Sequence, residues 1–166
     1  MKIEKQFLEA YDNYAAAILR HIQFRVSDQE TAQDLAQEVF FKAWQYIVSG
    51  REVKNFKPFL YKIANNLIID YYRQRPRADV PIEDINQKQI SYGPEQEKEA
   101  EREISASLAH KYLSLLEDEQ RQIVYHRYVD DLAIKEISEI TGKTANNVRV
   151  IIHRALKSLK DYVGKN

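Results

Sequence analysis

The chain has 166 residues, and its 25 lysines and arginines balance 25 aspartates and glutamates, so the formal net charge is zero. A hydrophobic content of 44% is enough to build real cores, and the absence of cysteine excludes disulfide scaffolds and thiolate metal sites. Four glycines and four prolines argue against collagen-like, loop-dominated and many-turned all-β folds. The composition therefore predicts an all-α protein.

The N-terminal segment MKIEKQFLEAYDNY is charged and amphipathic and lacks the apolar centre of a signal peptide. No run of about 18 apolar residues occurs anywhere in the sequence. These features predict a cytoplasmic protein without membrane insertion. A net charge of zero also argues at first against nucleic-acid binding, because nucleic-acid binders usually carry a basic excess.

The charges are, however, unevenly distributed along the chain. Residues 51–77 carry seven basic residues against two acidic ones, and residues 141–166 carry six against one. Between these blocks, residues 78–103 carry eight acidic residues against three basic ones. For any single block, an ordinary solvated helix face is as good an explanation as a binding surface. Two basic blocks that each coincide with a motif are stronger evidence for a binding function than a single block.

The first half of the chain predicts three helices. Residues 6–24 place apolar side chains at helical spacing. The run Ser27-Asp28-Gln29-Glu30 has the form of a capping box, so a second helix is expected to begin there and to stop near Ser49-Gly50. Pro58 suits the first turn of a third helix, which Pro76 should end.

Residues 76–93 contain two prolines, show no sustained period and lean acidic, which predicts a linker. Helical character resumes after Pro94, with a further helix over about 118–128. The final segment predicts two helices, 132–141 and 144–162, separated by Gly142-Lys143, which is the helix-turn-helix pattern.

The fold expected from these elements is all-α, with two small helical domains joined by a flexible linker and a helix-turn-helix in the C-terminal domain. The expected bounds are 1–77, 78–100 and 101–166. In the helix-turn-helix, isoleucines 134, 137 and 140 should pack on the inward face of the terminal helix. That inward face is expected to hold Ala145, Val148, Ile152, Ala155, Leu156 and Leu159.

The outward face of the terminal helix suits the major groove of DNA. Arginine can bond guanine with two hydrogen bonds, asparagine can read adenine, valine can touch a thymine methyl group and lysine can neutralise phosphate. Thr144 is placed as the N-cap, which would leave the first N–H groups pointing at a phosphate. The alternative is that these cations form an ordinary solvent-exposed helix face that binds nothing. The face consists of Asn146, Arg149, Val150, His153, Arg154, Lys157 and Lys160.

The outward face of the third helix combines amides and cations around one apolar side chain, which suits contact with unpaired bases and their backbone. A solvated polar face is the competing interpretation. Asp70 stands at the border of this face. Its other members are Lys62, Asn65, Asn66, Ile69 and Arg73.

The second helix presents acidic residues around an exposed phenylalanine, which indicates a docking surface for a basic partner. We expect this surface to hold Glu30, Asp34, Gln37, Glu38, Phe41 and Gln45.

No catalytic constellation is found in the sequence. None of the four histidines has a glutamate three residues before it, none forms a His-x-x-x-His pair, and no phosphate-binding or dinucleotide glycine motif occurs. We therefore expect no enzymatic activity, no metal and no cofactor. The pair Asp130-Asp131 beside His126 and Arg127 is interpreted as a corner between helices.

Three segments in order resemble one family. They are DLAQEVF at residues 34–40, FLYKIANNLIIDYYR at residues 59–73, and LEDEQRQIVYHRYV at residues 116–129 followed by the helix-turn-helix. Together they look like an extracytoplasmic function (ECF, group IV) sigma factor of the sigma-70 family. The resemblance covers nearly the whole chain and includes a linker where the family has one.

The resemblance implies partners for each segment. The D-x-x-Q-E-x-F element would dock on the clamp helices of the largest (β′) subunit of core RNA polymerase, with Asp34, Gln37, Glu38 and Phe40 as its residues. The acidic linker would thread through the polymerase interior. An anti-sigma factor is a further expected partner, because members of this family are commonly held inactive by one.

The resemblance also implies promoter contacts. The third helix and the loop before it would hold the melted -10 element, through Lys62, Asn66, Asp70 and Arg73. The terminal helix would read the -35 element, with Arg149, Val150 and Arg154 as candidates for contacts with base edges. The protein would then be a specificity subunit and not an enzyme, because polymerase carries the chemistry.

Two other functions fit the same patterns. One is a stand-alone helix-turn-helix transcriptional regulator whose N-terminal domain senses a ligand or dimerises. The other is a helical adaptor that sequesters a partner and uses its basic face for electrostatic docking.

Overall fold

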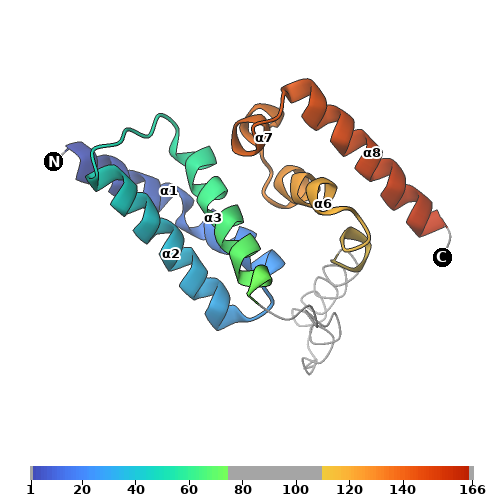
Figure 1. Cartoon of the computed structure of the whole chain (residues 1–166), viewed down its shortest axis with the longest axis horizontal. Coiled ribbons are helices and arrows are strands. Elements are labelled where there is room, and N and C mark those ends of the chain that lie inside the picture. Colours follow the sequence, from blue (N-terminus) through green and yellow to red (C-terminus); the bar gives the residue numbers. More distant parts are fainter. Residues whose placement is uncertain (1, 75–109, 165–166) are drawn as a thin grey trace, which may run out of the picture.

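The computed structural model describes residues 2–74 and 110–164, and every regular element in these ranges is helical (Figure 1). Three long helices form the N-terminal unit, and three short helical segments followed by a long terminal helix form the C-terminal unit. The predicted linker 78–100 and the helix expected after Pro94 lie outside the described residues, apart from a last helical turn at residues 110–113. The elements are α1 (Lys2–Arg25), α2 (Gln29–Val48), α3 (Phe56–Arg73), α6 (Asp118–Val124), η1 (Tyr125–Val129), α7 (Ile134–Thr141) and α8 (Ala145–Gly164).

The start of α2 differs from the sequence expectation by one residue. Asp28, and not Ser27, is the N-cap, and its carboxylate accepts a hydrogen bond from the backbone N–H of Thr31. Asp28 also accepts a hydrogen bond from the Thr31 hydroxyl. A carboxylate satisfies the free N–H groups at a helix start and opposes the positive end of the helix dipole. The capping box predicted at Ser27 is therefore wrong.

The third helix begins as expected. Asn55 caps α3 by accepting a hydrogen bond from the backbone N–H of Lys57 at 3.3 Å, and Pro58 is buried in the first turn. The buried stripe of α3 includes Leu60, Ala64 and Ile68, which recur at a spacing of four residues. The helix packs through this stripe against α1 and α2, so the N-terminal unit is a three-helix bundle.

The helix expected over 118–128 is present, but its second half is wider than an α-helix. It changes from α6 to the π-helical turn η1, and the backbone N–H of Asp130 bonds to the carbonyl of Tyr125 at 3.0 Å. Asp131 follows with a φ of 54°. Single π-turns inside helices are rare and are frequently found at functional sites. Here the π-turn carries His126 and leads directly to Asp130.

The helix-turn-helix is confirmed in outline. Gly142 ends α7 with a φ of 76°, a left-handed conformation that glycine adopts without strain. The Thr144 hydroxyl accepts a hydrogen bond from the N–H of Asn147 at 3.1 Å, as expected of the N-cap of α8. The first helix starts at Ile134, two residues later than predicted, because Leu132 is fully buried in the turn before it.

The core of the helix-turn-helix is partly different from the predicted one. Ile137, Ile140, Val148 and Ile152 share one cluster, as expected, but Ala155 and Leu159 belong to a second cluster around Leu113, Leu116, Val124 and Tyr125. Leu156 is 41% exposed although it was expected to face inward, and Ile151 is buried instead. The reason is length: α8 continues beyond the short α7 and its later turns pack on α6.

The two units share a hydrophobic core. The largest buried cluster joins Ile18 of α1 and Tyr61 of α3 to Ile123 of α6 and Ile137 of α7. In Figure 1, α3 is the helix of the N-terminal unit that faces α7, and the two helices pack against each other. The predicted domains are therefore in direct contact in this structure.

Candidate nucleic-acid interface

The outer surface of α2 is built as expected. Asp34, Gln37 and Glu38 are exposed, and Phe41 is 59% exposed. Phe40 points the other way: it is only 6% exposed and packs against Tyr11 with ring centroids 4.9 Å apart. Beside Phe41 lies an aromatic groove of about 480 Å³, lined by Glu4, Phe7, Leu8, Tyr11, Phe40, Phe41 and Trp44.

The outer face of α3 is split by the structure. Lys62, Asn66, Asp70 and Arg73 are exposed, as expected. Asn65 is not on that face, because it is only 3% exposed and lies between the two units. Its carboxamide is occupied by side chains of α1 and η1, so the structure removes Asn65 from the predicted surface.

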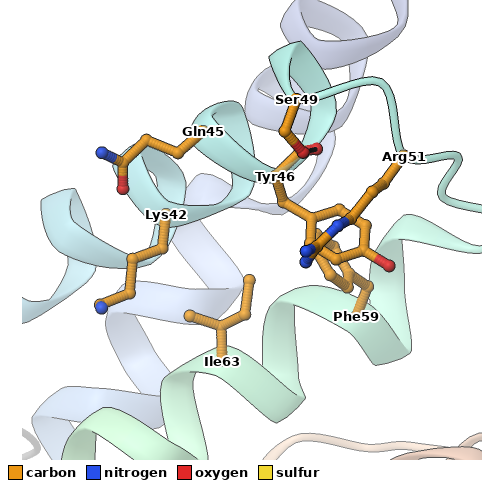
Figure 2. Close-up of a pocket in the computed structure, with 7 residues that line it drawn as sticks. All are labelled: Lys42, Gln45, Tyr46, Ser49, Arg51, Phe59 and Ile63. Carbon is orange, nitrogen blue, oxygen red and sulfur yellow. Dashed lines mark hydrogen bonds between the residues drawn. The ribbon is translucent and has the colours of Figure 1, made fainter.

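A cavity of about 410 Å³ opens between the end of α2 and the start of α3 (Figure 2). The Tyr46 and Phe59 rings lie with centroids 4.9 Å apart, and the guanidinium of Arg51 lies over the Tyr46 ring at 5.1 Å. Figure 2 shows the Lys42 side chain at the other side of the cavity, above Ile63. Gln45 and Ser49 complete the lining.

This cavity has the composition of a site for a base and its phosphate. Aromatic faces and an aliphatic side chain offer stacking, and two cations offer partners for the backbone. Tyr46, Arg51 and Phe59 were not among the predicted binding residues, although Arg51 opens the basic block 51–77. The signal that could have found them is this block, which follows a helix with Tyr46 in its last turn.

The outward face of α8 is fully available. Arg149, His153 and Arg154 are exposed, and Val150 lies among them with 36% exposure. The polar side chains come from one side of the helix because Val148, Ile152 and Ala155 occupy the other. The remaining predicted members, Thr144, Asn146, Lys157 and Lys160, are exposed as well.

A buried polar cluster joins the two units, and the sequence analysis did not find it. His21 Nδ1 lies 2.6 Å from Asp130 Oδ2, and His21 Nε2 lies 2.8 Å from Asn65 Oδ1. On the opposite side, Asn65 Nδ2 lies 2.8 Å from His126 Nε2, and His126 Nδ1 lies 3.0 Å from the same Asp130 oxygen. Arg25 donates to Asn65 Oδ1 at 3.1 Å. We call these five residues the interdomain polar cluster.

Burial and hydrogen bonding shift the pKa values in this cluster. Burial lowers the pKa of His126 and outweighs its hydrogen bond to Asp130. Burial alone would raise the pKa of Asp130, but hydrogen bonds from His126 and His21 outweigh it and hold that pKa below its usual value. Next to the cluster, burial raises the pKa of Tyr125 to about 12. Neutral His126 and ionised Asp130 are therefore the forms that the fold favours.

Hydrogen bonds also account for the approach of His21, His126 and Asp130, whose ligand-type atoms lie within 4.8 Å of one another. The two imidazole rings are stacked with an angle of 5° between their planes. Both Nδ1 atoms lie within hydrogen-bond distance of the same Asp130 oxygen, and both Nε2 atoms lie within hydrogen-bond distance of the Asn65 carboxamide. Each histidine nitrogen therefore has a hydrogen-bond partner within the cluster.

Two family models and several curated proteins match this chain. The chain matches the sigma-70 region 2 family over residues 8–78 and the sigma-70 region 4 family over residues 107–159. It is 31% identical over 152 residues to the ECF RNA polymerase sigma factor SigM of Bacillus subtilis, covering 92% of this chain and 91% of SigM. The chain belongs to the sigma-70 family. It is an RNA polymerase sigma factor of the ECF group.

A second curated relative spans the whole chain. The RNA polymerase sigma factor YlaC of Bacillus subtilis is 29% identical over 168 residues, covering 100% of this sigma factor and 96% of YlaC. The ECF RNA polymerase sigma factor SigW of the same organism is 29% identical over 164 residues, covering 93% and 87%. The resemblance inferred from three segments is thus confirmed along the full length.

Solved structures show the same fold. CnrH, in complex with the cytosolic domain of CnrY, superposes with a TM-score of 0.71 at 16% identity, covering 98% of this chain and 90% of CnrH. RpoE of Bartonella quintana, in complex with the anti-sigma factor NepR, superposes with a TM-score of 0.63 at 18% identity, covering 96% and 98%. Among the described residues of this sigma factor, no helix has both the length and the apolar character needed to cross a membrane.

The shifted pKa of His126 predicts how stability depends on pH. An unfolded chain binds a proton at His126 near pH 6.5, more tightly than the folded protein does, because burial lowers the folded pKa. The stability that neutral His126 contributes is therefore complete above about pH 6.5 and is lost as the pH falls. We expect the contribution of His126 to the free energy of unfolding, measured in urea titrations as the difference between wild type and His126→Gln, to be roughly 1 kcal/mol smaller at pH 5.5 than at pH 7.5.

The variant His126→Gln should show a smaller difference between the two pH values, because glutamine does not titrate and keeps an amide that can donate and accept. The control variant is His110→Gln. Burial also lowers the pKa of His110, which lies outside the cluster, so this variant measures how much of the pH dependence arises elsewhere. An equal pH dependence in wild type and His126→Gln would show that His126 is not the titrating group.

Proposed function

We propose that this sigma factor binds core RNA polymerase, recognises the -35 and -10 promoter elements and promotes DNA melting. Residues 1–77 would bind polymerase and the -10 element, residues 78–100 would form the linker, and residues 101–166 would bind the -35 element. The observation that carries this proposal is a pair of separate nucleic-acid surfaces, the cavity between α2 and α3 and the exposed face of α8. One surface suits unpaired bases and the other suits duplex.

The α2 surface supplies the contact with polymerase. Its acidic residues Asp34 and Glu38 are exposed around Phe41, so a basic helical partner would bury the phenylalanine and pair with the carboxylates. The clamp helices of the β′ subunit are the partner that the family implies. Phe40 would support this surface indirectly, because its ring packs on Tyr11 and lines the neighbouring aromatic groove.

The cavity between α2 and α3 would hold a flipped base of the -10 element. Capture of an unpaired base costs a few kcal/mol of unstacking, which a pocket available only to open DNA can offset. Tyr46 and Phe59 provide the stacking surface, while Arg51 and Lys42 lie where the adjoining phosphates would pass. Exposed Lys62, Asn66, Asp70 and Arg73 would continue the path of the strand along α3.

The α8 face would read the -35 element in the major groove. Arg149 and Arg154 can each form two hydrogen bonds with guanine, and Val150 can contact a thymine methyl group. Asn146 and His153 add donors, and Lys157 lies one turn further on for phosphate. The N-terminal N–H groups of α8, capped only by Thr144, are available to a second phosphate.

Regulation would follow the same family pattern. We propose an anti-sigma factor as a partner, supported by the complex of the structural relative RpoE with NepR. The sigma factor would act in the cytoplasm, where its polymerase is. It would supply specificity while polymerase carries out nucleotide addition, so it would not be an enzyme itself.

Run-off transcription tests the proposed function. Core RNA polymerase and a genomic promoter library are transcribed with and without the protein, and we expect transcripts that depend on it. A stand-alone regulator would instead bind duplex specifically without polymerase, and an adaptor would show no sequence preference. Absence of any dependent transcript contradicts the proposal.

The cavity is tested by comparing two templates of one responsive promoter. We expect Arg51→Ala to lower run-off transcription about tenfold on closed duplex, because one contact with a phosphate beside the flipped base is lost. A template with a preformed bubble at the -10 element should restore much of the activity, because melting is no longer required. The matched control is Arg20→Ala on α1. Equal losses on both templates would place Arg51 outside the melting step.

Base recognition by α8 is tested by two substitutions on its outward face. Arg149→Ala should relax the preference at one base pair of the -35 element, with a loss of roughly 1 to 3 kcal/mol of discrimination. Lys157→Ala should weaken binding equally for all sequences and reduce its salt dependence. The measurement is transcription from a library randomised at the -35 element. An unchanged preference in Arg149→Ala rules out its assignment.

A further inference from the structure

The interdomain polar cluster fixes its own protonation pattern. Arginine can only donate, so the Asn65 atom that faces Arg25 must be the carbonyl oxygen, and His21 Nε2 beside that oxygen must carry a proton. The amide nitrogen of Asn65 then donates to His126 Nε2, so the proton of His126 is on Nδ1 and is donated to Asp130.

The remaining bond completes the pattern. Asp130 Oδ2 already accepts from His126, and at 2.6 Å from His21 Nδ1 it accepts a second hydrogen bond. Asp130, whose side chain is 2% exposed, therefore bridges the two imidazole rings through one oxygen atom. Tyr61 of α3 closes the site with its ring edge-on to His21 at 5.2 Å. Every nitrogen of the two histidines has one partner.

The members of the cluster come from both units. His21 and Arg25 belong to α1 and Asn65 belongs to α3, whereas His126 and Asp130 belong to η1 and the residue after it. A buried charge is tolerated only when it is paired and hydrogen-bonded. Separation of the units would break two of these bonds, His21–Asp130 and Asn65–His126, and would leave buried polar groups of both units without partners, so the cluster favours the closed arrangement.

Closure covers part of the promoter face of α3. Asn65 is sequestered in the cluster, and Lys62 and Asn66 line one wall of a cavity of about 390 Å³. The opposite wall includes Asp118 and Glu119 of α6, whose carboxylates pair with Arg121 and Lys143, so this wall limits access to α3 by its bulk. Outside the cavity, the ion pair of Lys57 with Glu136 at 2.9 Å joins α3 to α7. The α8 face remains exposed in the same arrangement.

We propose that the interdomain polar cluster is a latch that holds the sigma factor in an autoinhibited state, in which the C-terminal unit covers the -10 face of α3 while the -35 face stays accessible. The identity of the covered face rests on the proposed function, whereas the latch itself rests on the bonds described above. Binding to polymerase would require the latch to open and α3 to separate from α7.

The latch is tested by measuring the distance between the units in the free protein. The chain has no cysteine, so Glu9→Cys on α1 and Asp161→Cys on α8, both exposed, accept spin labels without competing sites. Pulsed electron–electron double resonance should give one narrow distance distribution for the otherwise unchanged protein. In His21→Ala and in Asp130→Asn the distribution should become broad and extend to longer distances.

Two controls separate opening from unfolding. Glu139→Ala removes an exposed hydrogen bond of 3.4 Å between the units and should leave the distribution narrow. Labels at Glu9→Cys and Gln33→Cys, both within the N-terminal unit, should keep their distance in every variant. The double variant of His21→Ala with Asp130→Asn should open no further than either single variant, because both substitutions act on the bond between His21 and Asp130.

A broad distribution in the unaltered protein, or a narrow one in both cluster variants, overturns the latch. Its effect on the promoter face is measured by the affinity for a single-stranded -10 oligonucleotide. Asp130→Asn should bind about tenfold more tightly if the closed form makes up about nine tenths of the free protein. Opening without a gain in affinity shows that the covered face is not a DNA site, whereas failure of run-off transcription concerns the proposed function alone.

Discussion

The buried pair of His21 and Asp130 sets the relation between the two halves of this sigma factor. Both side chains are nearly inaccessible to water, so their polar atoms must find hydrogen-bond partners inside the protein. Asn65 supplies a partner for His21 and, through its other end, for His126. Because the groups come from α1, α3 and the segment after η1, these hydrogen bonds can form only where the shared core brings the helix-turn-helix against the first three helices.

This arrangement gives the functional surfaces different accessibility. The acidic and aromatic surface of α2 and the cationic face of α8 point away from the junction, while α3 contributes its most central polar residue to it. The zero net charge of the chain can be understood in the same terms. Lys57 of α3 pairs with Glu136 of α7, and Lys143 pairs with Glu119 of α6, so charge that would attract DNA is partly compensated within the protein.

Features that depend on neighbouring residues in the chain were predictable. The three N-terminal helices, the left-handed turn at Gly142 and the Thr144 cap follow from apolar spacing and local hydrogen bonding. The residues of α2 and α8 that we propose to contact polymerase and the -35 element are exposed where helical periodicity placed them, with Phe40 the exception. Family membership was also recoverable, because three motifs in order are specific where one motif is not.

The sequence by itself thus determined the helices, their order, the family and most surface residues. Only the tertiary structure decided that Asn65 is buried, that His126 is neutral and that Asp130 is bonded across the chain. Periodicity identifies the side of a helix that is polar but not what lies opposite it, and His21 and Asp130 are separated by 109 positions. Their pairing depends on where separate helices meet, which is fixed by packing of a shared core and not by any local pattern.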